Sequence, residues 1–116
     1  MKLTMGKFYD LCATIEIMRN TPVAGMAKYV WDLDNAITTD RQFYVQELKK
    51  IEAKYGKIDE ESEEAKELMK AETNDLPELS REKIELLDKY PLLPVQYGLM
   101  LELVKEDKND GESNNS

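Results

Sequence analysis

The sequence contains no histidine and a single cysteine, Cys12. Histidine is the commonest general base and the commonest protein ligand for metals, so its absence removes most familiar hydrolytic and metal sites. A lone cysteine cannot form an internal disulfide, and here it has no histidine to activate it as a nucleophile. We therefore expect no catalytic activity and no bound metal or other cofactor. We expect Cys12 to be a small hydrophobe buried in the core.

The chain also lacks any run of about twenty apolar residues, and it does not open with a secretory signal. These absences predict a protein that stays in the cytoplasm and does not enter a membrane. With 116 residues it fits one domain. Its charged fraction of 34% is above the globular average, which is typical of a helical protein with much exposed surface.

The net charge of −8 is unevenly distributed along the chain. Residues 57–75 carry three basic and eight acidic side chains, whereas residues 1–56 carry eight basic and seven acidic ones. An acidic surface repels phosphate backbones and favours encounters with basic partners, so we do not expect nucleic-acid binding. DNA mimicry would need acidic residues along a whole face, and here they are confined to one segment.

Apolar residues with helical spacing predict an amphipathic helix that ends near Arg19, followed by a turn at residues 20–21. Pro22 suits the first position of a second helix, and Gly56 suits a left-handed cap at its end. The apolar spacing continues throughout this second segment, at Val23, Met26, Val30, Leu33, Ile37, Tyr44, Leu48, Ile51 and Tyr55. We therefore predict an antiparallel helical hairpin with one long helix from about 22 to 55. At ~1.5 Å per residue this helix would be roughly 50 Å long, so the first helix would leave its far half uncovered.

The remainder of the chain predicts short helices near residues 62–71, 80–89 and 92–104. Residues 76–79 surround a proline and could form one short edge strand. The last helix is the best internal candidate to cover the far half of the long helix. The predicted class is all-α or mostly α, with a single helical domain over residues 1–104 and a disordered acidic tail over 105–116.

A resemblance to a known family rests on three segments and on the leucine-rich C-terminal part. The three segments are TPVAGMAKYVWDLDNAI, EAKYGKIDE and EAKELMKAET. They resemble a family of small uncharacterised proteins from phages and prophages of Gram-positive bacteria, over roughly residues 3–104. Members of that family commonly have a longer insertion after the Tyr-Gly pair, which is shortened here to IDEESEE. The resemblance implies a phage or prophage source and action inside a bacterial host cell. It brings no catalytic residues.

Two groups of side chains are candidate binding sites. The uncovered side of the long helix is a candidate face for self-association or for a protein partner, formed by Tyr44, Leu48, Ile51 and Tyr55. The basic end of the same helix is a candidate anion-binding site, formed by Lys50, Lys54 and Lys57. These lysines are also explained as cations that complement the negative end of the helix dipole. Tyr29, Trp31 and Phe43 would mark a contact surface if all three were exposed together.

These observations favour a non-enzymatic phage accessory protein that binds a phage or host protein and self-associates. An oligomeric inhibitor of host antiviral defence that sequesters a small anionic nucleotide signal is one alternative. A virion structural subunit is another.

Overall fold

The structure is a computed structural model that describes residues 1–105, and it confirms the helical class. In this described part of the chain, two 3-10 helices and five α-helices follow one another: η1 Met5–Lys7, α1 Phe8–Arg19, α2 Ala27–Ala36, α3 Thr38–Tyr55, α4 Glu63–Lys70, η2 Arg81–Lys89 and α5 Pro94–Glu102. No strand forms within residues 1–105. The segment expected to hold one makes only an isolated bridge, between Leu79 and Val104.

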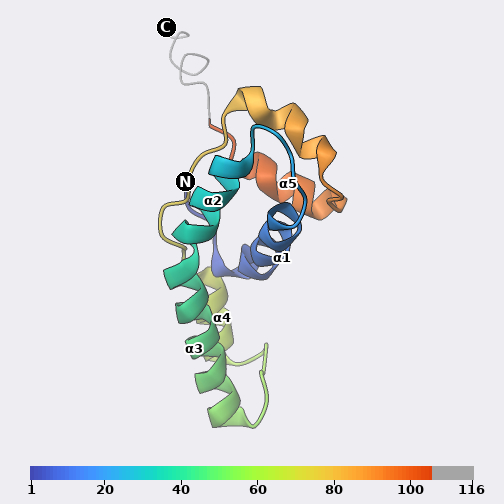
Figure 1. The fold of residues 1–116 in the computed structure, drawn as a ribbon. Helices are drawn as coiled ribbons and strands as arrows, with labels where there is room; N and C mark the ends of the chain where they lie inside the picture. Colours follow the sequence, from blue (N-terminus) through green and yellow to red (C-terminus); the bar gives the residue numbers. More distant parts are fainter. Residues whose placement is uncertain (106–116) are drawn as a thin grey trace, which may run out of the picture.

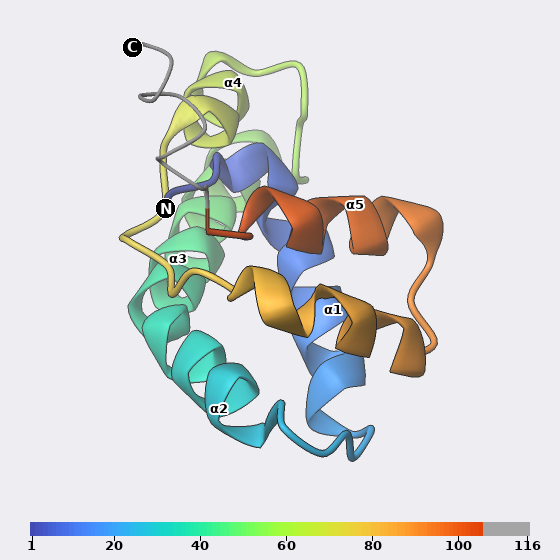
Figure 2. The same cartoon turned by 90° about the horizontal axis from the view of Figure 1, so that it is seen from above.

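Helix α1 lies at the centre of the fold and contacts both α2 and α5 (Figures 1 and 2). Its apolar stripe is buried as predicted, at Phe8, Leu11, Ile15 and Met18. Each such side chain contributes about 1.5–3 kcal/mol when it leaves water. This stripe is therefore what fixes α1 between its two neighbours.

The second helix begins at Ala27 rather than at Pro22. Gly25 has a φ of 88°, which lies in the left-handed region and cannot continue a right-handed helix. The Nζ atom of Lys83 donates to the Gly25 carbonyl oxygen (2.6 Å), which holds the turn against η2. Residues 22–26 therefore form a loop, and Pro22 is not the first residue of a helix.

The predicted long helix is divided into α2 and α3 at Ile37, whose φ and ψ of −90° and 1° depart from helical values. The hydroxyl of Thr38 donates to the carbonyl oxygen of Asp34 (3.3 Å), a contact that often bends helices. Ile37 is β-branched, as are Thr38 and Thr39 after it, and such residues have lowered helix propensity. The apolar spacing continues through this position, so it did not predict the break.

Helix α4 covers the far half of the second helical segment, and α5 does not. Figure 1 shows α3 and α4 side by side, extending away from the body formed by α1, α2 and α5. Ser62 caps α4 by accepting a hydrogen bond from the Ala65 N–H (3.1 Å). The expectation that residues 92–104 cover α3 is therefore wrong, because α5 packs on α1 instead.

Backbone hydrogen bonds tie the two ends of the described chain to segments in its middle. The Thr73 N–H donates to the Leu3 carbonyl oxygen (2.8 Å), which fixes the N-terminal segment beside α4. The Lys105 N–H donates to the Leu79 carbonyl oxygen (2.7 Å). Of the predicted tail only Lys105 is described, and residues 106–116 lie outside the described part of the chain.

Candidate binding pocket

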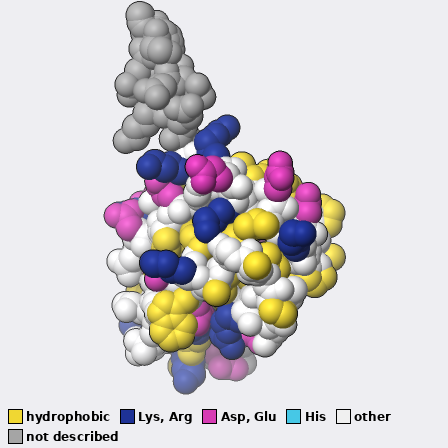
Figure 3. Space-filling view, turned by 45° about the horizontal axis from the view of Figure 1, so that its top comes forward, with side chains coloured by type: hydrophobic (Ala, Val, Ile, Leu, Met, Phe, Trp, Pro, Cys, Tyr) yellow, Lys and Arg dark blue, Asp and Glu magenta, His cyan; other side chains and the backbone are white. Residues whose placement is uncertain are grey.

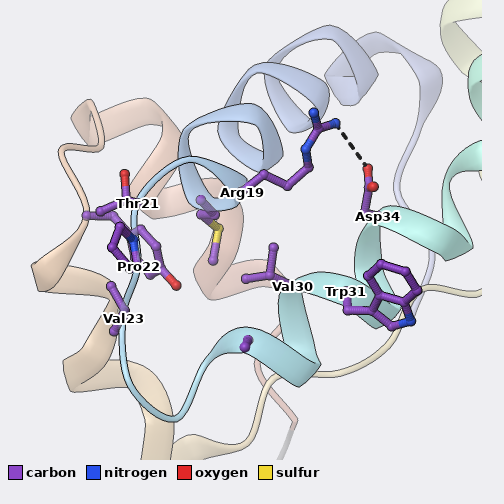
Figure 4. Close-up of a pocket in the computed structure, with 10 residues that line it drawn as sticks. Arg19, Thr21, Pro22, Val23, Val30, Trp31 and Asp34 are labelled. Atoms are coloured by element: carbon purple, nitrogen blue, oxygen red, sulfur yellow. Dashed lines mark ion pairs between the residues drawn. The ribbon is translucent and has the colours of Figure 1, made fainter.

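A pocket of about 330 Å³ lies between the C-terminal end of α1, the loop 20–26 and α2. Figure 4 shows Val30 at its centre, Pro22 and Val23 on the loop, and Trp31 on the opposite side. The loop that borders the pocket contains Gly25, whose φ of 88° prevents a right-handed helix there. A helix starting at Pro22 would have removed this loop.

The floor of the pocket is apolar and belongs to the core. Met18 from α1 and Val30 from α2 are both buried, and Tyr90 after η2 closes the far side. These side chains are held by the packing of three different elements. The floor is therefore rigid, as closely packed interiors are.

Trp31 stands at the edge of the pocket with 68% of its surface exposed, and it is the single tryptophan of the chain. Apolar side chains reach the surface singly on many proteins, and Figure 3 shows them scattered among charged ones here. Trp31 borders a concave site with an apolar floor. A large exposed aromatic beside a pocket is typical of a contact surface.

One wall of the pocket is charged. Asp34 and Arg19 form an ion pair on this wall (3.8 Å between Nη1 and Oδ1, Figure 4), and Arg41 approaches the same oxygen at 3.3 Å. Two guanidinium groups thus share one carboxylate, and Arg19 also lies 3.7 Å from a carboxylate oxygen of Glu16. The site combines an apolar floor with a polar wall, which suits a partner's apolar side chain next to a hydrogen-bonding group.

The cysteine lies elsewhere on α1 and is half-buried. Burial raises the pKa of the Cys12 thiol, although the nearby Arg41 opposes this shift. A raised pKa reduces the fraction of thiolate at neutral pH, and the thiolate is the reactive form. Within residues 1–105 no three side chains of the metal-binding types are gathered as a ligand set.

Two of the three lysines of the predicted anion site are paired with carboxylates. The Nζ of Lys50 pairs with Glu47 (3.0 Å), and Lys54 pairs with Glu64. Lys57 is exposed and has no ion-pair partner within residues 1–105. Two of the three charges are therefore neutralised by carboxylates of the same chain.

Glu64 receives two hydrogen bonds at the tip of the α3–α4 pair, one from Lys54 and one from the Tyr55 hydroxyl (2.7 Å). The hydrogen bond from Lys54, followed by that from Tyr55, lowers the pKa of Glu64 to about 2. The same contact raises the pKa of Lys54. The basic end of α3 thus serves to hold α4.

The predicted partner face of α3 is largely covered within one chain. Ile51 is only 3% exposed, and Tyr44 and Leu48 are half-buried against the core. The ring of Tyr44 lies 5.3 Å from that of Phe8, centroid to centroid. Only Tyr55 of this face is exposed, so the face does not by itself require a second subunit, and self-association stays a prediction.

The three aromatic residues expected to mark a surface together are separated in the structure. Tyr29 is buried and its hydroxyl donates to the Pro77 carbonyl oxygen (3.0 Å), whereas Trp31 and Phe43 are exposed beside different pockets. Sequence reasoning missed the pocket because Arg19 and Asp34, which pair on one of its walls, lie on different helices and meet only when α2 packs on α1. The one available indication was a tryptophan off the apolar stripe.

None of the helices within residues 1–105 combines the length and apolar character needed to cross a membrane. Comparison of the chain with protein-family models, with curated proteins and with solved structures finds no match.

Proposed function

We propose that this protein is a phage accessory protein without catalytic activity, which acts in the bacterial cytoplasm by binding a phage or host protein. The observation that carries the proposal is the pocket beside α2, with the exposed Trp31 at its edge. An apolar side chain of the partner enters this pocket and packs against the tryptophan ring.

The dimensions and chemistry of the pocket favour a protein as the ligand. A volume of about 330 Å³ is at the lower end for small-molecule sites, which span about 300–1,000 Å³, and it suits one or two side chains. Binding energy at protein interfaces concentrates in a few buried aromatic and arginine side chains. Trp31 and Arg19 supply both types at one site.

The phage source and the bacterial compartment are supported by the sequence resemblance described above. The two alternative functions have weaker support. A site for an anionic nucleotide would need cations that converge, and Lys50 and Lys54 are each paired with a carboxylate. A virion subunit would be expected to co-purify with particles.

The test is affinity purification of the tagged chain from phage-infected cells, followed by mass spectrometry. The variant Trp31→Ala should lose the captured protein. Tyr9→Ala is the matched control because Tyr9 is an aromatic side chain of similar exposure, at 71%, which does not line the pocket. A partner captured equally by both variants would contradict the proposed site. Recovery of a nucleotide or of particles in place of a protein would favour the corresponding alternative.

The identified partner can then be titrated directly. Because Trp31 is the single tryptophan, its fluorescence reports on the pocket without labelling when a tryptophan-free fragment of the partner is used. We expect a blue shift of the emission on binding, as the ring leaves water. An unchanged spectrum at saturation would place the contact elsewhere.

A further inference from the structure

A second groove, of about 410 Å³, lies between α3 and α4 on the part of the molecule that extends from the body (Figure 1). Its apolar surface comes from Phe43 on α3 and from Leu68 and Ala71 at the end of α4. Phe43 is 41% exposed, although it lies beside the buried Leu68. The groove therefore exposes an aromatic ring that α4 covers only in part.

The rim of this groove is acidic, with Glu47 from α3 and three residues of α4, Glu63, Glu64 and Glu67. Among the residues that the structure describes, no lysine or arginine lines it. Glu47 and Glu64 are paired with lysines of α3, but within residues 1–105 neither Glu63 nor Glu67 has an ion-pair partner. These two lie at positions i and i+4 of one helix, where like charges repel each other by a few tenths of a kcal/mol.

The segment around the groove is acidic, like the rim of the groove. Residues 57–75 carry a net charge of −5, which is most of the excess of the whole chain. A concave surface with one sign of charge attracts and orients a partner of the opposite sign. The groove thus pairs an apolar floor with a rim that selects cations.

We propose that this groove binds an amphipathic helix of a partner protein in which lysine or arginine residues flank an apolar stripe. The apolar side chains of that helix pack on Phe43 and Leu68, and its cations meet Glu63 and Glu67. Two helices side by side form a natural groove for a third, which contacts them through residues at helical spacing. This site is separate from the Trp31 pocket, so a negative result at one site leaves the proposal for the other unaffected.

The probe is a synthetic amphipathic peptide of leucine and lysine, about fourteen residues long, which at ~1.5 Å per residue spans the length of α4 with a margin. Binding is measured by calorimetry at low and at physiological salt. A peptide of the same composition, scrambled to remove the apolar stripe, separates groove binding from general attraction to an acidic protein. We expect the ordered peptide to bind more tightly than the scrambled one at both salt concentrations.

Two charge-matched variants test the location. Changing Glu63 and Glu67 to glutamine should weaken binding roughly fivefold, since two rim charge pairs are lost. Changing Glu60 and Glu61 to glutamine removes the same charge outside the groove, and should weaken binding less than twofold. Phe43→Ala should weaken binding roughly tenfold, and Tyr9→Ala, at an exposed aromatic that does not line the groove, should leave it unchanged.

Backbone NMR shifts of the titrated protein give a second, independent measurement of the site. We expect the largest changes in α4 and in the first half of α3. Equal losses in the two double variants, equal binding of the scrambled peptide, or shifts concentrated outside α3 and α4 would each overturn the proposal. So would the absence of binding of the ordered peptide to the unchanged protein at low salt. Circular dichroism of each variant should match that of the unchanged protein.

Discussion

Asp40, in the first turn of α3, accepts two hydrogen bonds from Asn74, one from its backbone N–H (3.1 Å) and one from its side-chain amide (3.2 Å). Both bonds end on the same oxygen, and the other oxygen of Asp40 is buried without a hydrogen-bond partner among residues 1–105. The side chain is 4% exposed. This contact fastens the segment after α4 to the start of α3 across 34 residues of sequence.

The first prediction concerns this contact. Asp40→Ala should lower the free energy of unfolding by about 1–3 kcal/mol, because the Asn74 N–H is left without its acceptor. Asp40→Asn should cost less, since its amide oxygen can still accept and no charge is buried. Urea denaturation of both variants is the measurement. An Asp40→Asn variant less stable than Asp40→Ala would show that the charge itself is required.

A second prediction uses two glycines with opposite backbone conformations. A Cβ atom added at Gly98, within α5, would meet no atom within 4 Å, so Gly98→Ala should stabilise the fold by about 0.5–1 kcal/mol. Gly25→Ala should destabilise it by about 1–2 kcal/mol, because a φ of 88° strains any residue with a Cβ. Thermal unfolding should show the melting temperature rising by roughly 2–6 °C for Gly98→Ala. A fall would mean that another chain packs closely on α5.

The third prediction is a pH dependence at the tip of α3 and α4. The pKa of Glu64 is lowered to about 2 by its hydrogen bonds with Lys54 and Tyr55. A lowered folded-state pKa stabilises the fold above the ordinary glutamate pKa, near 4.3, and this stabilisation is lost as the pH falls towards 2. Glu64→Gln should therefore remove part of the acid sensitivity in this window. The test compares denaturation midpoints of both proteins between pH 5 and pH 2, with Glu61→Gln as the exposed control. Parallel curves for all three would contradict it.

A fourth prediction separates folding from self-association. Ile51 is buried within one chain, so Ile51→Glu should unfold the protein even when it is dilute, because the charge has no partner in the core. Circular dichroism and sedimentation velocity together decide the outcome. A variant that stays helical but changes from an oligomer to a monomer would identify the Tyr44–Tyr55 side of α3 as a subunit interface. Tyr55→Glu, at the exposed end of that side, is the matched control.

The sequence by itself determined the helical class and the ends of several helices. The apolar stripe of α1 is buried as predicted, Ser62 and Ser80 accept hydrogen bonds at the starts of α4 and η2, and Gly56 ends α3 with a φ of 77°. These features depend on interactions between residues within about one helical turn of each other, so the local sequence predicts them. A local pattern is sufficient for them.

Only the tertiary structure decided which helices lie together and where the pockets form. The position of the turn at Gly25 against η2 and the covering of α3 by α4 both depend on partners distant in sequence. Apolar periodicity shows that a face must be buried, but any apolar face of suitable shape can cover it. The pairing of Asp40 with Asn74, like the pairing of Arg19 with Asp34, becomes fixed only when the whole core packs, because the cost of ordering each contact is repaid by the others.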